Sequence, residues 1–496
     1  MAAEKKFEPL VLAALTLLAL VLRLIAFLYW TDAPGDGPIR AMLAYRWWMS
    51  HSIPTHGGWP PGFKLLAGAF YPVVHDPVVS TRILNVILGT ATVPVFYLFA
   101  RRVYNGMVAL FSALLLAVFP LHIALSATSL SEPSALFEIV LGALLVMIAA
   151  ETTRRRSLYL TVSLACLCMA TMTRYEVWLL IPLFPAYYIW KTRQPFVGGV
   201  MMVVLLAFPT AWTVGNYSFG GVGYMLHLGV AAIGDAPRPT IQTHPRDLVH
   251  AAGTLGRTAV ANLGIVAVAV SWGAALQLLR AAKGKLESES ALHLSMATVP
   301  WLTMIVVAVA RPNWDGDRFL LLNFVLALPL ALLPFEPWYH THRRAFNTIL
   351  VVSVLSVGVA NVHYMPSALY VTQKRPTDML RTGSWLRHSA YRDDAVLLTE
   401  MHWESTYFRV YFPEFDSRAL TVDSWTPDSA VPAFLAERRP TVVITRDDDE
   451  AFFSRVRALL GTEAHVGHVV HSEGKVKVYL LTLSDPNSLG NDPRRP

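Results

Sequence analysis

The sequence predicts a polytopic α-helical membrane protein that ends in a small α/β domain. Of its 496 residues, 54% are apolar and only 15% are charged, whereas an ordinary soluble domain is about 25% charged. Apolar runs of membrane-spanning length recur up to about residue 364. From about residue 370 the charge rises and short β-prone runs appear, which indicates a second, water-exposed part.

About eleven apolar runs are each near the length that a helix needs to cross a bilayer. The first of them follows Glu4, Lys5 and Lys6 and has no small-residue cleavage site, so we expect it to remain as a signal anchor. The runs lie at roughly 9–30, 80–100, 106–125, 131–150, 157–173, 176–190, 196–216, 257–280, 290–310, 318–336 and 345–364.

The basic residues predict an orientation. The net charge of +7 comes from clusters placed between apolar runs, so it favours membrane topology over a nucleic-acid partner. With a cytoplasmic N-terminus, every such cluster faces the cytoplasm, as the positive-inside rule expects. The clusters are Arg101 with Arg102, Arg154 to Arg156, Lys191 with Arg193, Arg280 with Lys283 and Lys285, and Arg343 with Arg344. We therefore expect a multi-pass protein of the cell (plasma) membrane.

We expect a transmembrane domain over 1–364, an extracytoplasmic α/β domain over 365–483 and a disordered tail over 484–496. In the second domain, runs at 395–399 and 441–445 predict strands, and 450–460 predicts a helix. Two further β-prone runs within 465–481 flank Ser472, Glu473 and Gly474, which predicts a hairpin.

The first outer loop, 31–79, is too long for a simple connector and is rich in polar and aromatic residues. Apolar residues at helical spacing predict a short interfacial helix over 38–50, with Asp36 at its start. Asp36 either caps this helix or acts as a catalytic base, and spacing alone favours neither role. Tyr45 and Trp59 in the same loop are candidates for substrate binding.

Carboxylates also mark the start of the fourth predicted span. Glu132 precedes Pro133 and is either an ordinary helix-start residue or a catalytic carboxylate. Glu138 lies about two turns deeper, where a carboxylate is costly unless it pairs or faces a wet cavity. It therefore either contacts substrate or is protonated and bonded to a neighbouring helix.

Two further outer turns carry charges. Arg174 and Glu176 join the fifth and sixth spans, where they either snorkel to the interface or bind ligand. Asp315 and Asp317 form an Asp-x-Asp pair that can ligate a divalent cation, although the pattern is short and common. Arg318 begins a span, where it either anchors the helix or grips a lipid-linked phosphate.

Together these turns place acidic and basic groups at one membrane level, which predicts a single outward-facing polar cavity. Such a pair of charges suits displacement at the anomeric carbon of a sugar. A carboxylate takes the proton of an acceptor hydroxyl, and cations stabilise the departing lipid phosphate.

The ordered series of motifs resembles the GT-C superfamily of membrane glycosyltransferases, in particular family 39, the protein-mannosyltransferase and aminoarabinose-transferase-like branch. The resemblance covers about the first 335 residues. The motifs are 34-PGDG-37, 59-WPPGFKLLAGAFYP-72, the run 82–123 with its Arg pair, 131-SEP-133, 173-TRYE-176 and 317-DRFLLLNFVLALP-329.

The resemblance implies a GT-C-like fold and inverting hexosyl or pentosyl transfer from a polyprenyl-phosphate donor to a lipid, glycan or protein acceptor. Asp36 looks like the first-loop catalytic carboxylate, and Glu132 is the second catalytic candidate. Arg318 looks like the phosphate-contacting arginine, with Arg174 and Lys64 as further phosphate candidates; Glu176 and Glu138 are expected to bind substrate. The enzyme requires either no cofactor or a divalent metal.

Two departures from the known families keep alternatives open. Asp36 is followed by Gly where protein mannosyltransferases carry an acidic pair, and the tail has no Trp-Trp-Asp motif of the oligosaccharyltransferases. An oligosaccharyltransferase-like enzyme, a transporter or flippase, and an inactive scaffold remain as alternatives. A transporter would place its charges near the bilayer midplane, often in repeated halves, whereas here they sit at helix ends.

Overall fold

In a computed structural model of the chain, the described residues are 2–29, 36–233, 245–310, 317–368, 377–399, 404–422, 430–437, 441–446, 454, 458 and 464–483. Contacts divide the chain into two compact units. Unit 1 contains residues 1–33 and 43–372, and unit 2 contains residues 34–42 and 373–496.

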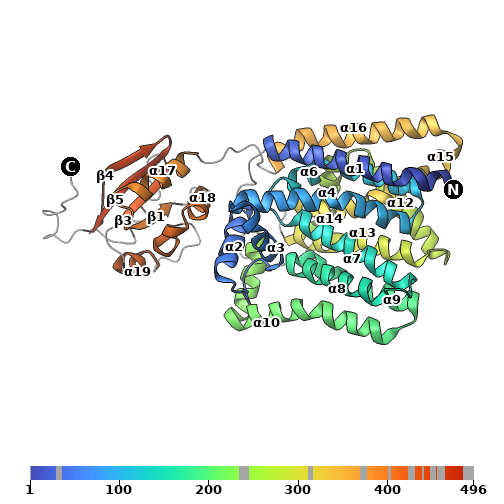
Figure 1. The fold of residues 1–496 in the computed structure, drawn as a ribbon, viewed down its shortest axis with the longest axis horizontal. Coiled ribbons are helices and arrows are strands. Elements are labelled where there is room, and N and C mark those ends of the chain that lie inside the picture. Colours follow the sequence, from blue (N-terminus) through green and yellow to red (C-terminus); the bar gives the residue numbers. More distant parts are fainter. Residues whose placement is uncertain are drawn as a thin grey trace. The chain divides into compact units, whose positions relative to one another are not determined.

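Unit 1 is a bundle of helices, and its long members run nearly parallel to one another (Figure 1). In chain order the helical elements up to residue 368 are α1 (Ala2–Tyr29), α2 (Asp36–Ser50), α3 (Gly62–Val74), α4 (Pro77–Val103), α5 (Gly106–Ala117), α6 (Pro120–Ser126), α7 (Glu132–Glu151), α8 (Arg156–Thr173), η1 (Tyr175–Leu180), α9 (Leu183–Thr192), α10 (Pro195–Ile233), α11 (Pro245–Leu263), α12 (Val266–Ala282), α13 (Ser288–Ala310), η2 (Asp317–Leu320), α14 (Leu321–Ala327), η3 (Leu328–Phe335), α15 (Glu336–Thr341) and α16 (Arg343–Ala368).

The described helices confirm a multi-pass membrane protein. Six of them are long and apolar enough to cross a bilayer, or up to eight if each bent pair counts as one span. The straight candidates include α1, α4 and α7. Each apolar run of the sequence has a helical counterpart, but the expected eleven crossings stay a prediction.

Two of the expected spans are bent. Helices α5 and α6 meet at 56°, directly before Pro120, whose missing N–H interrupts the helical hydrogen bonds. The run 257–280 is divided at Gly264, whose φ is +56°, and its two halves meet at 115°. A glycine adopts this left-handed conformation at little cost. The connection 217–256 between two predicted spans is helical over 217–233, with a break at Gly221 (φ +65°), and over 245–256.

The late span that begins near Arg318 is irregular for a related reason. It changes from α-helix to 3₁₀ geometry at Leu328, next to Pro329. Pro329 has no N–H to offer the carbonyl of Leu326, and that carbonyl instead lies 2.8 Å from Nε2 of buried His293 on α13. Nε2 therefore donates, and Nδ1 accepts from the Tyr104 hydroxyl at 2.9 Å. The broken helix is thus tied to two neighbours.

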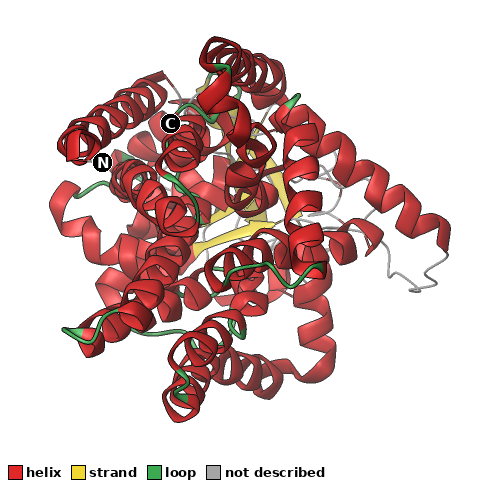
Figure 2. Cartoon of the chain, turned by 90° about the vertical axis from the view of Figure 1, so that its right-hand side faces the viewer, coloured by secondary structure: helices red, strands yellow, loops and turns green. Residues whose placement is uncertain are grey.

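Unit 2 contains an α/β domain. Its described strands are β1 (Ala395–Thr399), β2 (Ala419–Val422), β3 (Thr441–Arg446), β4 (Ala464–Glu473) and β5 (Val476–Leu483), and in the described residues strands occur only in this part of the chain (yellow in Figure 2). The sheet order is β2-β1-β3-β5-β4; β1 pairs parallel with β2 and β3, whereas β5 pairs antiparallel with β3 and β4. The remaining elements are α17 (Thr377–His388), α18 (Glu404–Tyr411), η4 (Pro413–Arg418) and α19 (Ala430–Glu437).

The expected strands at 395–399 and 441–445 are confirmed as β1 and β3. The hairpin is confirmed as β4 and β5, which turn at Gly474 with φ of +55°. The helix expected over 450–460 lies almost wholly outside the described residues, and the tail 484–496 lies wholly outside them. Apolar side chains cover both faces of the sheet: Val396, Val442 and Val478 belong to one cluster, and Leu397 and Val443 to another.

Close backbone approach between α12 and η3 yields a prediction about stability. A Cβ atom on Gly273 would overlap the carbonyl group of Leu330, so Gly273→Ala should destabilise unit 1 by about 1–3 kcal/mol, as overpacking does. Thermal unfolding of the purified protein in detergent measures this change.

Gly199→Ala is the matched control. Gly199 is also helical, but a Cβ atom added to it would meet no other atom within 4 Å, so alanine should be neutral or slightly stabilising. Equal melting temperatures for the two variants would contradict the close packing of α12 on η3.

Candidate functional site

The candidate site is built on the first turn of α7. Glu132 is the first residue of that helix and is followed by Pro133, which suits a helix start. The partial positive charge of a helix N-terminus stabilises a carboxylate there. Only 4% of the Glu132 side chain is exposed, so this carboxylate requires charged partners from the protein.

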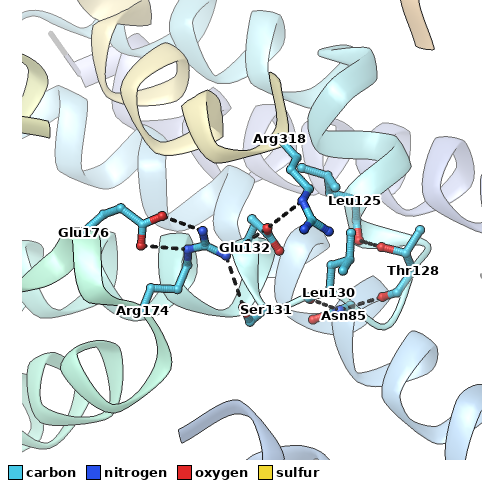
Figure 3. Close-up of polar contacts among 9 residues, drawn as sticks. All are labelled: Asn85, Leu125, Thr128, Leu130, Ser131, Glu132, Arg174, Glu176 and Arg318. Carbon is cyan, nitrogen blue, oxygen red and sulfur yellow. Dashed lines mark hydrogen bonds and ion pairs between the residues drawn. The ribbon is translucent and has the colours of Figure 1, made fainter. Parts of the chain in front are cut away.

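Arg174 supplies the main partner. It follows the last residue of α8 with an extended backbone, and its Nη1 lies 2.8 Å from Oε1 of Glu132. The short η1 helix then brings Glu176 back onto the same guanidinium, with Nη2 to Oε1 at 2.5 Å and Nε to Oε2 at 3.1 Å. Nη1 also lies 3.3 Å from the Ser131 hydroxyl. Arg174 is thus held by two carboxylates at once (Figure 3).

Arg318 comes to the same carboxylate from a distant part of the chain. It lies in η2, and its Nε is 3.9 Å from Oε1 of Glu132 (Figure 3). The ring of Phe319 lies beneath both guanidinium groups, with its centroid 4.8 Å from Cζ of Arg318 and 5.2 Å from Cζ of Arg174. Such cation–π contacts orient an arginine without neutralising it.

These residues line one narrow pocket. Its polar lining consists of Glu132, Glu176, Arg174 and Arg318, and its apolar lining consists of Ala135, Leu136, Val177, Phe319 and Leu322. Two carboxylates and two guanidinium groups give the lining a balanced formal charge. We call this the charge cluster: Glu132, Arg174, Glu176 and Arg318.

The electrostatics of Arg174 follow from its partners. Burial lowers the pKa of a guanidinium, but the charges of Glu132 and Glu176 more than offset this, and the pKa of Arg174 is raised overall. Arg174 therefore stays protonated at every physiological pH.

The charge cluster lies at one end of the bundle. Helix α7 has 20 residues from Glu132 to Glu151, which corresponds to about 30 Å, the thickness of a bilayer core. Glu151 at its far end pairs with Arg102 of a predicted cytoplasmic cluster. Lys191 of another such cluster pairs with Glu289 at 2.5 Å. Glu132 of the charge cluster and the pair of Arg102 with Glu151 thus lie at opposite ends of α7.

Neither Lys64 nor Glu138 lines the pocket of the charge cluster. Lys64 is on α3, whose first residue, Gly62, packs so closely on the end of α8 that a Cβ would lie 2.7 Å from atoms of Met172 and Thr173. Glu138 is buried, and its Oε1 accepts a hydrogen bond from the Ser134 hydroxyl at 2.8 Å. Ser134 belongs to the same helix, α7, so this contact favours neither substrate contact nor bonding to a neighbouring helix, and the role of Glu138 stays a prediction.

The first-loop residues occupy two helices and the segment between them. Asp36 is the first residue of α2 and is half-buried, which confirms a helix close to the expected 38–50. Tyr45, further along α2, packs edge-to-face on Tyr71 of α3 with ring centroids 5.1 Å apart. Trp59 is half-buried in the segment before α3. The roles of all three stay predictions.

The expected metal pair cannot be assessed as a pair, because Asp315 lies outside the described residues and only the backbone of Asp317 is described. Within the described ranges, no group of three or more His, Cys, Asp or Glu side chains could hold a metal ion.

Several residues of the site were not singled out from the sequence. Ser131 and Phe319 contact the arginines directly. The Tyr175 hydroxyl accepts a hydrogen bond from Trp212 of α10 at 2.9 Å, and Asn216 of the same helix accepts from the N–H of Gly57 at 2.8 Å. An asparagine within an apolar span is a sequence signal that would have pointed to the contact of Asn216 with Gly57.

Part of the chain matches the model of a known protein family. Residues 58–212 match the family model described as dolichyl-phosphate-mannose-protein mannosyltransferase. This stretch contains Glu132, Arg174 and Glu176. No curated protein matches the chain significantly.

Solved structures resemble the whole chain. The oligosaccharyltransferase of Archaeoglobus fulgidus, in complex with Zn and sulfate, matches with a TM-score of 0.57 and 12% identity over 95% of this chain and 72% of its own. ArnT from Cupriavidus metallidurans bound to undecaprenyl phosphate matches with a TM-score of 0.58 and 12% identity over 94% of this chain and 97% of its own. At these identities the likeness establishes the fold.

The double pairing of Arg174 predicts a specific loss of stability. Arg174→Met leaves two nearly buried carboxylates without their cation, which should cost about 3 kcal/mol or more. Adding Glu132→Gln and Glu176→Gln removes the stranded charges and should recover part of this loss. Thermal unfolding in detergent of the single and triple variants measures both effects.

Arg102→Met serves as the control, because its pairing with Glu151 is about one-third exposed and such pairs contribute about 1 kcal/mol or less. A loss for Arg174→Met no greater than that for Arg102→Met would show that the charge cluster is not held as the structure indicates.

Proposed function

From the GT-C fold of this chain, the fold of a superfamily of membrane glycosyltransferases, we propose that it transfers one monosaccharide from a polyprenyl-phosphate carrier to an acceptor at the outer face of the cell membrane. The observation that carries the proposal is the charge cluster. Two arginines and two carboxylates line one pocket at the end of α7 opposite the pair of Arg102 with Glu151, where the headgroup of a lipid-linked sugar would enter.

The reaction needs a base, a leaving-group site and an in-line path. In the proposal the Asp36 carboxylate takes the proton of an acceptor hydroxyl, and the acceptor oxygen attacks the anomeric carbon. The bond from that carbon to the phosphate oxygen breaks, its electron pair stays on the phosphate, and the configuration of the sugar inverts. Polyprenyl phosphate leaves with the negative charge.

Arginine side chains stabilise that charge. A guanidinium is always protonated and binds phosphate in a bidentate manner. Arg318 is the proposed phosphate contact, because it lines the pocket and its face rests on Phe319. Arg174 has bidentate contact with Glu176 and a second carboxylate, Glu132. We therefore assign Arg174 mainly to orienting Glu132, and Lys64 to a supporting role at the phosphate.

We propose a monophosphate carrier over a diphosphate carrier on the basis of the structural comparison. The full-length match to ArnT, which was crystallised with undecaprenyl phosphate, agrees with this choice of donor.

The second candidate is transfer of a lipid-linked oligosaccharide. It is favoured by the similarly strong structural match to the A. fulgidus oligosaccharyltransferase, one crystal of which carries a tethered acceptor peptide with an NVT sequon. The fold comparison does not separate the two candidates, because their TM-scores are equal at 0.58. Donor selectivity does separate them.

The test is consumption of radiolabelled donors by the purified protein in nanodiscs. The panel contains polyprenyl-phosphate hexoses and pentoses and one polyprenyl-diphosphate glycan. We expect one monophosphate donor to be consumed. Asp36→Asn should lower the rate by about 10²–10⁴-fold, as loss of a general base does, and Arg318→Ala by about 10²–10³-fold, as loss of a transition-state charge contact does.

Arg102→Ala is the matched control, since this arginine pairs with a glutamate at the other end of the bundle and should leave the rate unchanged. Consumption of only the diphosphate donor would favour the oligosaccharyltransferase-like candidate. No consumption of any donor, together with unaltered donor binding in both variants, would exclude glycosyl transfer and favour a transporter.

A further inference from the structure

The turn that leads into the charge cluster has an unusual source of hydrogen bonds. Residues 127–131 connect α6 to α7, and they are buried although they belong to no regular element. A buried backbone carbonyl needs a donor, and near hydrocarbon that donor must come from the protein. The carbonyls of this turn are therefore satisfied by side chains of another helix.

That helix is α4. Nδ2 of Asn85 lies 2.6 Å from the carbonyl oxygen of Thr128 and 2.6 Å from that of Leu130 (Figure 3). Nε of Arg82 donates to the carbonyl of Ala127 at 2.7 Å. Carbonyls along the turn are thus bound by two residues spaced three apart on one face of one helix.

Two further contacts fix the turn in place. The hydroxyls of Thr81 and Ser129 lie 2.6 Å apart. A Cβ on Gly89, one turn beyond Asn85, would overlap Oγ of Ser126, the last residue of α6. Because Gly89 has no side chain, α6 can approach α4 closely enough for the turn to reach Asn85.

The position of this turn also determines the position of the charge cluster. The Leu130 carbonyl held by Asn85 belongs to the peptide group that begins Ser131, and the Ser131 hydroxyl lies 3.3 Å from Arg174. Glu132 follows directly as the first residue of α7. A shift of the turn by about 1 Å would therefore move the Glu132 carboxylate relative to both arginines, and a displacement of that size is enough to impair catalysis.

Arg82 connects a second segment to this turn. Its Nη2 donates to the carbonyl of Phe27 at 2.7 Å, and its guanidinium lies 4.3 Å from the centroid of the Phe27 ring. Phe27 is near the end of α1, from which the chain continues toward Asp36. One buried arginine thus bonds the backbone of two segments, each of which leads in sequence to a proposed catalytic residue.

We propose that Asn85 and Arg82 are positioning residues of the transferase site, which fix the turn 127–131 and thereby hold Glu132 at the correct place against Arg174 and Arg318. Neither is expected to touch substrate. The expected effect on the transfer rate rests on the proposed function, whereas the expected effect on the turn 127–131 does not.

The kinetic test is a double-mutant cycle in the nanodisc assay. Asn85→Leu is nearly isosteric and removes both donated hydrogen bonds. We expect it to lower the transfer rate about 10–100-fold, as loss of an outer-shell partner does, with the loss in kcat rather than in KM. In the Glu132→Gln background the same change should cost less than about threefold, because residues that act through one another are not additive.

Thr92→Val on α4 is the control. Thr92 is also buried, but its hydroxyl bonds the Leu88 carbonyl of its own helix, so the rate should stay within about twofold of wild type. If the rate losses of Asn85→Leu and Glu132→Gln multiply fully in the double variant, the proposal is overturned, because Asn85 then does not act through Glu132.

Hydrogen–deuterium exchange tests the structural consequence without any substrate. In Asn85→Leu, faster exchange confined to 127–132 supports the proposal, and unchanged exchange there or a general loss of protection overturns it. If no donor is consumed by the wild type, the proposed function fails and this exchange result alone decides the inference. If Asn85→Leu does not fold, Arg82→Lys, which cannot serve two carbonyls as arginine does, replaces it in both arms.

Discussion

A bilayer core contains no water to bond with an interrupted helix, and this constraint governs where the bundle departs from regular structure. Several breaks in the described helices have a donor from a neighbouring helix. The carbonyls between α6 and α7 are bound by Asn85 and Arg82, and the Leu326 carbonyl by His293. Non-helical backbone at membrane depth is tolerated only where protein satisfies it. These irregular segments are for that reason rigidly held, and the candidate site lies beside one of them.

The buried charges of the site are likewise stabilised by partners from the protein. An isolated ion with so little exposure would be costly, but Arg174 faces two carboxylates, and the cost of desolvation is offset by their attraction. The arrangement leaves a pocket whose dipoles and charges are already oriented before a ligand arrives. Preorganised charge is the largest single contribution to many enzymatic rates, because no reorganisation is needed as charge develops on the leaving group. The same ion pairs thus stabilise the buried charge cluster and preorganise it for its proposed catalytic use.

The sequence predicted a large part of this arrangement, and particular residues show why. Glu132, Arg174, Glu176 and Arg318 were selected from three separate turns because each lies at the predicted outer end of a span, and they do meet in one pocket. The helical start at Glu132 and the strands β1 and β3 also agree with the pattern of apolar residues. Periodicity and charge at helix ends depend on local sequence, so they are readable without a structure.

Other features depend on contacts between distant residues. The 115° bend near Gly264 and the bend before Pro120 were not expected, because a glycine or proline within an apolar run leaves both a straight and a broken helix open. Asn85 and Arg82 lie within an apolar run that the sequence marked only as a span, and their partners in the turn are more than forty residues away. Glu138 has the same side chain as Glu132, yet it bonds Ser134 of its own helix and does not line the pocket.

The sequence by itself therefore determined which runs enter the membrane, which helix ends carry charge and where the α/β domain begins. These features follow from the transfer free energies of neighbouring residues, summed along each segment. Only the tertiary structure decided which charges pair, which carbonyls are bound and how closely two helices approach. Those outcomes depend on distances of a few ångströms between segments that the chain separates by tens or hundreds of residues, and hydrogen bonds and ion pairs lose their strength over such small displacements.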